Sequence, residues 1–223
     1  MDSPATENAM HRRTFLSATS VLAASVGLGG GEARASTPAR TLSVFNNVSL
    51  DGYFTDDASD MSWAHTQDPE WNKFMSTNAS GEAELVFGRK TYEMMARFWP
   101  SKEAAQAMPD VARGMNRMRK TVFSHTLKSV DWENSRLAQA DLATEIRRMK
   151  SEPGPNLLIL GSGEIVAQLT QAGLIDAYQL VVVPIVLGSG RTLFEGVTGK
   201  PRLELTKTRA FENGNVVGWY KRS

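Results

Sequence analysis

The sequence predicts an α/β protein: a mainly parallel β-sheet, helices on both faces of the sheet, and an antiparallel edge at the C-terminal end. Two observations lead to this class. Short apolar segments alternate with amphipathic, helix-like segments, which is the pattern of parallel strands joined by crossover helices. The last two extended segments, 203–208 and 216–220, are separated by Glu212-Asn213-Gly214-Asn215, which favours a closing antiparallel hairpin.

Local signals predict the elements of the first half. Residues 41–50 have the alternating, β-branched residues of a strand, which Asp51-Gly52 ends. Asp68 and Pro69 are a helix N-cap and a first helical residue, and the helix should run to about residue 80. A short strand at 85–87 leads through a polar turn into a second helix, in which Glu93 and Arg97 have the spacing of an ion pair.

The second half continues the alternation. Residues 101–118 are interpreted as a connection with helical patches, residues 121–123 as a strand and residues 141–150 as a helix that Pro153-Gly154-Pro155 ends. The β-rich run 176–187 contains Pro184, which predicts that a strand bends or leaves the sheet there.

Composition limits the class of function. A chain of 223 residues fits one domain, or at most two, and its 25 basic residues nearly cancel its 24 acidic ones, so no nucleic-acid partner is indicated. With no cysteine and three scattered histidines, we expect no disulfide, no thiolate nucleophile and no metal site.

The N-terminal 35 residues have the order of an export signal. Arg12-Arg13 precedes an apolar segment that runs to about Gly31 and ends in Ala33-Arg34-Ala35, an A-x-A type cleavage site. This predicts a twin-arginine signal peptide over residues 1–35, transport by the Tat translocase to the periplasm or beyond, and one folded domain over residues 36–223. The apolar segment is shorter than the ~20 residues of a membrane-spanning helix.

The stretch 156–171 organises the chain. An apolar strand leads into Gly161-Ser162-Gly163 and then into a helix that starts near Glu164. Glycines allow a phosphate to approach the backbone, and the free amides and positive dipole of a helix N-terminus attract it. Such a turn is also common without a ligand, and the Glu164 carboxylate must point away if the site binds phosphate.

Three polar turns follow three short strands. They are Gly88-Arg89-Lys90-Thr91, Ser124-His125-Thr126 and Gly161-Ser162-Gly163. Ligands of open α/β sheets bind beyond the carboxyl ends of the strands, so the turns can converge on one dinucleotide. We expect backbone amides and the hydroxyls of Ser162 and Thr91 to hold its pyrophosphate. Arg89, Lys90 and the 124–126 turn would meet a further phosphate, as in NADPH.

Several motifs together resemble the dihydrofolate reductase-like superfamily, and in particular the C-terminal reductase domain of the bifunctional riboflavin-biosynthesis deaminase/reductase and its stand-alone relatives. The motifs occur in the family's order and extend over nearly all of residues 40–222: Ser49-Leu50-Asp51-Gly52, Phe87-Gly88-Arg89-Lys90-Thr91-Tyr92-Glu93, Leu160-Gly161-Ser162-Gly163, Gly173-Leu174-Ile175-Asp176 and Pro184-Ile185-Val186-Leu187-Gly188. The resemblance implies a three-layer α/β/α sandwich, NADPH as cofactor, a homodimer, and cofactor turns at 88–91, 124–126 and 161–164.

Two positions depart from the family pattern. His125 stands where family members often have arginine, which weakens the preference for NADPH over NADH. Tyr53 stands where the riboflavin-pathway enzyme has lysine, which argues against a phosphoribosylamino-pyrimidine substrate. Nothing in the residues excludes a flavin or deazaflavin.

Candidate substrate-side residues each have an alternative interpretation. Asp51 either lines the substrate pocket or is the turn residue of an Asp-Gly pair. Asp68 resembles the acid of dihydrofolate reductases, although a helix cap explains it better. Trp63 walls the pocket or packs in the core. His125 is a titrating phosphate contact or a surface turn residue.

A basic cluster is interpreted as a solvated helix face rather than a binding patch. It consists of Arg113, Arg117, Arg119 and Lys120.

The sequence leaves two possible functions. One is an exported NADPH-dependent reductase of a small heterocyclic (pterin- or pyrimidine-like) substrate. The other is a dinucleotide- or flavin-binding protein of the cell envelope without turnover.

Overall fold

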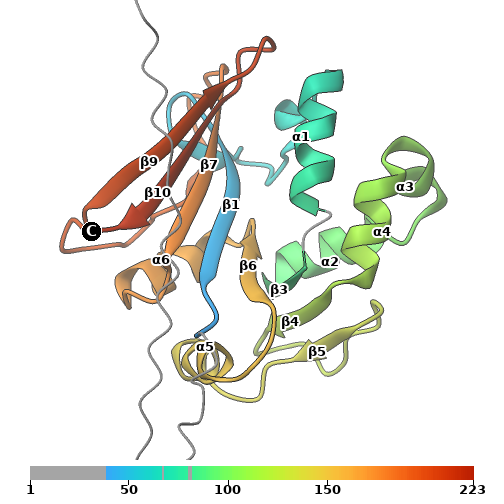
Figure 1. Ribbon diagram of the computed structural model, residues 1–223, viewed down its shortest axis with the longest axis vertical. Coiled ribbons are helices and arrows are strands. Elements are labelled where there is room, and N and C mark those ends of the chain that lie inside the picture. The colour runs from blue at the N-terminus through green and yellow to red at the C-terminus, as the bar shows by residue number, and fades with distance from the viewer. Residues whose placement is uncertain (1–38, 67, 80–81) are drawn as a thin grey trace, which may run out of the picture. The chain divides into compact units, whose positions relative to one another are not determined.

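The protein forms an eight-stranded sheet with helices on both faces, seen in the computed structural model of Figure 1. The structure describes residues 39–66, 68–79 and 82–223; the predicted export signal lies outside these residues and stays a prediction. The strands are β1 (Leu42–Ser49), β2 (Tyr53–Thr55), β3 (Ala83–Gly88), β4 (Arg119–Phe123), β5 (Ser135–Leu137), β6 (Asn156–Leu160), β7 (Ala177–Val183), β8 (Arg191–Thr192), β9 (Leu203–Ala210) and β10 (Val216–Arg222). The helices are η1 (Ser62–Ala64), α1 (Pro69–Ala79), α2 (Arg89–Phe98), α3 (Lys102–Ala107), α4 (Pro109–Arg117), α5 (Leu142–Ser151) and α6 (Gly163–Gln171).

The sheet is parallel except at its C-terminal edge. Its strand order is β5-β4-β3-β6-β1-β7-β10-β9, with parallel pairing from β5 to β7 and antiparallel pairing of β10 with β7 and β9. The predicted fold class is therefore confirmed. β7 ends at Val183, immediately before Pro184, because proline cannot donate a ladder hydrogen bond.

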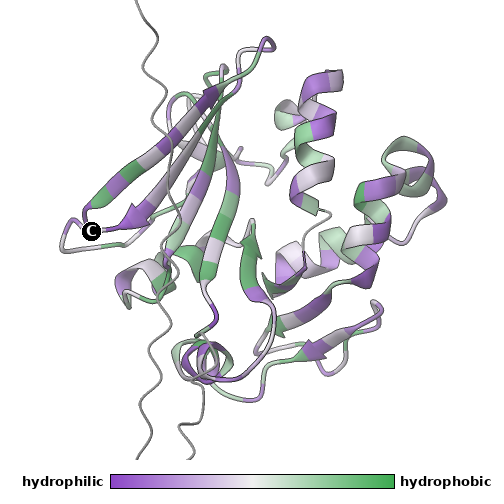
Figure 2. Cartoon of the chain, viewed as in Figure 1, coloured by the Kyte–Doolittle hydropathy of each residue, from purple (hydrophilic) through white to green (hydrophobic). Residues whose placement is uncertain are grey.

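Helices α5 and α6 cover one face of the sheet, and α1, α2 and α4 cover the other. On the first face Leu42, Val44 and Ile159 pack with Ile146 of α5 and Leu169 of α6. Alternate strand residues point the other way, where two further clusters form with α2 and α4 and with α1. Figure 2 shows hydrophobic residues along the central strands and mixed surfaces on the covering helices. The result is the three-layer sandwich implied by the family resemblance.

The structure contains elements that local signals did not predict. Helices α3 and α4 fill the segment interpreted as a connection, and Gly114 lets α4 approach α1: a Cβ there would lie 2.3 Å from the carbonyl oxygen of Ala79. The short strands β2 and β8 pair with each other, and β5 extends the sheet edge. All three strands have only two or three residues, too few for a recognisable alternation.

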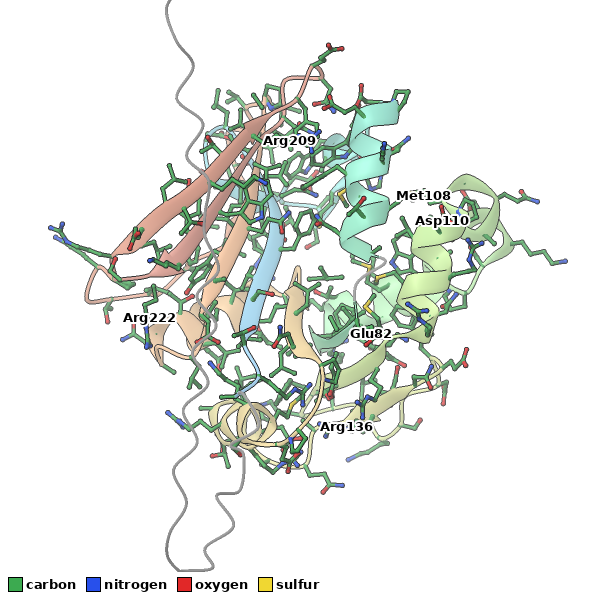
Figure 3. The ribbon with its side chains drawn as sticks, viewed as in Figure 1. Glu82, Met108, Asp110, Arg136, Arg209 and Arg222 are labelled. Carbon is green, nitrogen blue, oxygen red and sulfur yellow. The ribbon has the colours of Figure 1, made fainter. Side chains whose placement is uncertain are left out.

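A chain of ion pairs is buried near the amino ends of the strands. Arg40, before β1, donates to Glu84 of β3 at 2.8 Å, and Glu84 also accepts from the Thr121 hydroxyl at 2.7 Å. Arg136 (labelled in Figure 3) lies 3.6 Å from Glu84 and 2.7 Å from Glu145, and Arg148 continues the chain to Glu152. Burial opposes ionisation of Glu84, but hydrogen bonds from Thr121 and Arg40 outweigh it and lower its pKa.

The interpretation of Lys120 as part of a solvated face was wrong, although Arg113, Arg117 and Arg119 are exposed. The Lys120 side chain is fully buried, and its ammonium donates to the carbonyl oxygens of Asn116, Met118 and Glu133 at 2.8–2.9 Å. It also lies 4.2 Å from the ring centroid of Trp132. Burial lowers the pKa of Lys120 to about 8. The lysine therefore joins the end of α4 to the segment before β5.

The Glu84→Gln substitution should lower the free energy of unfolding by about 3–5 kcal/mol, because it leaves the buried Arg40 guanidinium without its counter-charge. Urea unfolding followed by circular dichroism measures this loss. The control is Glu152→Gln at the exposed end of the same chain of ion pairs, where we expect less than about 1 kcal/mol. Equal effects of the two substitutions would contradict the structural role of Glu84.

Acid should destabilise the fold through the same carboxylates. The pKa of Glu145 is lowered, mainly by the hydrogen bond from Arg148, and the pKa of Glu84 is lowered as well. Their contribution is fully present above the unfolded-state pKa, about 4.3, and is lost as pH falls through the folded-state values. The urea midpoint should fall between about pH 5 and pH 3, and it should fall less in Glu84→Gln.

Candidate cofactor site

The three predicted turns lie side by side at the carboxyl edge of the sheet. They follow β4, β3 and β6, which are consecutive neighbours in the sheet, and Gly88 of β3 is in register with Phe123 of β4. Because the three strands are parallel, their carboxyl ends meet at one edge. The sheet topology therefore brings the three turns to one edge, as predicted.

Two side-chain hydrogen bonds lock the first turn to the last. The amide of Gly88 donates to Ser162 Oγ at 2.9 Å, and the amide of Ser162 donates to Thr91 Oγ1 at 3.1 Å. Gly88 precedes α2 and Ser162 precedes α6, so the N-termini of the two helices are held together. The first amides of each helix have no partner within it, and both positive dipole ends favour an anion at this place.

The backbone of the last turn is strained in a way that glycine alone tolerates easily. Gly161 and Ser162 have φ values of 62° and 59°, in the left-handed region. A Cβ on Gly161 would lie 3.1 Å from Thr91 Cγ2. Ser162 keeps this conformation because its amide and its hydroxyl are both held by the neighbouring turn. Strain retained by such contacts is characteristic of ligand sites.

The middle turn, Ser124-His125-Thr126, is held by hydrogen bonds to its own serine side chain. Ser124 Oγ accepts hydrogen bonds from the amides of Thr126 at 3.1 Å and Leu127 at 2.9 Å, and the side chains of His125 and Thr126 are exposed. The exposure of His125 is compatible with both interpretations of this residue. The assignment of this turn to a cofactor phosphate stays a prediction.

Lys90 is a more available cation than Arg89. Arg89 bonds both carboxylate oxygens of Glu93, at 2.9 and 3.2 Å, so Glu93 has a different partner from the predicted Arg97. Lys90 is exposed, and within the described chain it has no carboxylate partner. A phosphate beyond this turn would meet Lys90 directly and would compete with Glu93 for Arg89.

Glu164, in the first turn of α6, pairs with Arg191 of β8 at 3.0 Å. Arg191 also lies 5.9 Å from the ring centroid of Phe54, whose ring packs against Gly163. The pair borders a polar hollow of about 440 Å³ beside α6. The carboxylate that would repel a phosphate is thus neutralised. Sequence reasoning missed Arg191 because it lies in a two-residue strand and in no motif.

Asp51 joins the loop after β1 to the loop after β7. Its carboxylate accepts hydrogen bonds from the Ser49 hydroxyl at 2.6 Å and from the amides of Leu187 and Gly188 at 3.1 and 2.8 Å. These bonds, chiefly the one from Ser49, lower the pKa of Asp51 to about 2. The carboxylate is therefore ionised at neutral pH and organises the rim of the site. Its catalytic role stays a prediction, and the geometry gives it no proton to donate.

The other two candidates also have structural partners. Asp68 Oδ1 accepts from the amide of Trp71 at 2.6 Å, so the carboxylate caps α1. Trp63 packs beside the aromatic cluster of Trp71 and Phe211, and its indole donates to the carbonyl oxygen of Asp60 at 3.1 Å. It is only partly buried, and its assignment to the wall of a substrate pocket stays a prediction.

A larger hollow, about 770 Å³, lies elsewhere. It is bordered by α1, by α4 and by Glu133 and Asn134. Arg117 of α4 comes just before β4, so this hollow adjoins the amino ends of the strands, away from the three turns. Its position separates it from the candidate site.

The residues at the locked turns fit the phosphates of a dinucleotide. Two helix N-termini meet there, and the nearest carboxylates, Glu93 and Glu164, are both paired with arginine. An anion can therefore approach without an unpaired negative charge beside it. The two glycines make room for protein side chains: a Cβ on Gly161 would meet Thr91 and one on Gly163 would meet the ring of Phe54. The fold and the arrangement of the three turns are those of the dihydrofolate reductase-like class.

The chain belongs to the RibD C-terminal domain family, whose model matches residues 40–217. Among curated proteins, YyaP of Bacillus subtilis is 25% identical over 169 residues, covering 76% of this chain and 88% of YyaP.

Solved structures agree on the fold. A putative riboflavin biosynthesis protein from Shewanella sp. PV-4 has a TM-score of 0.63 at 22% identity, covering 82% of this chain and 99% of that one. Dihydrofolate reductase from Enterococcus faecalis, solved with NADP(H), has a TM-score of 0.55 at 15% identity, covering 82% and 96%. At these identities the likeness shows the fold.

The Thr91→Val substitution should weaken dinucleotide binding by about tenfold and destabilise the protein by about 1–3 kcal/mol, because the Ser162 amide loses its acceptor. Thr91→Ser keeps the hydroxyl, so this variant should retain most of the dinucleotide affinity and most of the stability. Calorimetric titration with NADPH and thermal unfolding measure the two effects. If the valine variant binds NADPH like the wild type, the hydrogen bond between the Ser162 amide and Thr91 is not needed for binding.

Proposed function

We propose that this protein is an NADPH-dependent reductase of a small heterocyclic, pterin- or pyrimidine-like substrate. The observation that carries the proposal is the pair of helix N-termini held together by Ser162 and Thr91 at the carboxyl edge of the sheet. Membership of the RibD C-terminal family supports it, as does the shared fold with a dihydrofolate reductase solved with NADP(H).

Each turn has a role in the proposal. Amides at the starts of α2 and α6, with the hydroxyls of Ser162 and Thr91, would bind the pyrophosphate. Lys90, Arg89 and the 124–126 turn would bind the phosphate on the adenosine ribose. The bound cofactor would supply a hydride to a C=N or C=C bond. Because Asp51 is ionised and Asp68 caps a helix, water is the better proton source.

The substrate would differ from the riboflavin intermediate. Tyr53 stands where the pathway enzyme has lysine, so a cation is missing at the start of β2. We therefore favour a heterocycle without a phosphoribosyl group over 5-amino-6-(5-phosphoribosylamino)uracil. The proposal includes export of the protein to the periplasm, directed by the signal sequence at residues 1–35, and assembly into a homodimer.

A second candidate is an exported protein that binds a dinucleotide, flavin or deazaflavin without turnover. The signal-like sequence at residues 1–35 favours it, because a periplasm offers no route to regenerate NADPH. A substrate that oxidises bound NADPH would exclude this candidate, whereas binding without oxidation across pterin, pyrimidine and flavin compounds would support it.

Titration with NADPH and with NADH, followed by tryptophan fluorescence, tests the cofactor. We expect saturable one-to-one quenching that prefers NADPH and weakens at least about tenfold in the Arg89→Ala/Lys90→Ala variant, which loses two charge-assisted phosphate contacts. The matched control, Lys102→Ala/Arg147→Ala, removes the same charges from exposed positions on α3 and α5. Absence of saturable binding of either nucleotide would overturn the reductase proposal.

A further inference from the structure

Strand β9 is an open edge of the sheet. It is last in the strand order and pairs only with β10, and residues 204–210 are exposed. Figure 1 shows it at the outer side of the C-terminal hairpin. Within the described chain, the backbone groups on its outer side therefore have no strand partner. An open edge of eight residues is a template for pairing with another strand.

The charged side chains of β9 lie on the face of the sheet that α1 covers. Lys207 lies 4.9 Å from the ring centroid of Trp219, and Arg209, labelled in Figure 3, lies 4.3 Å from that of Phe211. Both rings belong to the cluster packed against α1. Glu204 shares this face, because it pairs with Lys221 across the hairpin at 3.1 Å. Charge is therefore confined to one side of the strand.

The opposite face of β9 carries no charge. Leu203 and Tyr220 of β10 pack against the cluster under α5 and α6, and Leu205 is in register with Tyr220. Thr208 and Ala210 alternate with the charged residues and so lie on this face too. Leu205 is 52% exposed. A strand added to this edge would meet an uncharged, partly apolar surface on this side.

A β-bulge in the middle of β9 makes its two halves match each other. Lys207 faces Trp219 and Leu205 faces Tyr220, so Thr206 is an extra residue. The alternation of faces shifts by one there, and residues at equal distances before and after the bulge share a face. A second β9 running antiparallel about a two-fold axis at the bulge would therefore set like faces side by side in both halves.

Charge complementarity selects this pairing. About the axis, Glu204 of each copy faces Arg209 of the other, and Leu205 faces Thr208 on the uncharged face. Opposite charges directly across two strands are stabilising, and like charges are destabilising. A shift of one residue would mismatch the faces. A shift of two residues that sets Arg202 opposite Arg209 would bring like charges together.

We propose that two copies of this chain pair through β9, antiparallel and with the two-fold axis at the bulge, so that their two sheets become continuous. The inference rests on the homodimer included in the proposed function and names its interface; it does not use the reductase chemistry. β1, β7 and β10 separate β9 from β6, the nearest strand that carries a cofactor turn. Both candidate cofactor sites therefore stay open in the dimer.

Charge reversal tests the pairing by sedimentation of the full chain. Glu204→Arg and Arg209→Glu should each weaken the dimer at least about tenfold, and the double variant should return to within about threefold of the wild type. Glu103→Arg, exposed on α3, is the matched control and should change nothing. If these charges acted only on Lys221 and Glu70 of their own chain, the double variant would be the worst of the three.

Introduced cysteines test the register, because the chain has none of its own. Leu205→Cys/Thr208→Cys should form a disulfide-linked dimer on air oxidation, since Cα atoms directly opposite in antiparallel strands are about 4.5–5.5 Å apart. Within one chain the two positions are on the order of 10 Å apart, too far for a disulfide. Each single cysteine variant should stay without a cross-link.

Three results would overturn the inference. They are a full chain that sediments as a monomer, a double charge variant that dimerises as weakly as the single ones, and a double cysteine variant that cross-links no more than the single ones. NADPH titration of the same samples separates the proposals. A monomer that binds NADPH would end the homodimer and leave the reductase standing. A dimer that binds no NADPH would end the reductase and leave the interface standing.

Discussion

The hydrogen bonds that Ser162 makes with the turn after β3 are the constraint on which the candidate site depends. Its hydroxyl accepts from the Gly88 amide, and its own amide donates to Thr91. Without them the N-termini of α2 and α6 would be positioned only by packing on opposite faces of the sheet. With them, the two positive helix ends lie together, as the proposed anion site requires, and the left-handed conformation of Ser162 is held in place.

Charges are arranged differently at the two ends of the sheet. At the amino ends, Arg40, Glu84, Arg136 and Glu145 neutralise one another in a largely buried chain that stabilises the fold. At the carboxyl ends, carboxylates are paired at the surface by Arg89 and Arg191, and Asp51 accepts three hydrogen bonds from the loops. The proposed anionic cofactor would therefore approach an edge where negative charge is already compensated.

Much of the fold could be predicted because its signals are local. Apolar runs set the parallel strands, Asp68-Pro69 set the start of α1, and Pro184 set the end of β7. The backbone of the site could be predicted as well, since the turns follow from strand ends and glycines. The short strands β2, β5 and β8 could not, because two or three residues carry no periodicity and their pairing depends on partners far along the chain.

The sequence by itself determined the alternation of strands and helices, the family, and the three turns at the strand ends, because these depend on residues close together in the chain. Only the tertiary structure decided which polar groups are buried and what they contact. Lys120 is enclosed by three carbonyl oxygens, and Arg191 neutralises Glu164. Each of these contacts joins segments distant in sequence, and the free energy of a buried polar group is set by those partners rather than by its neighbours in the chain.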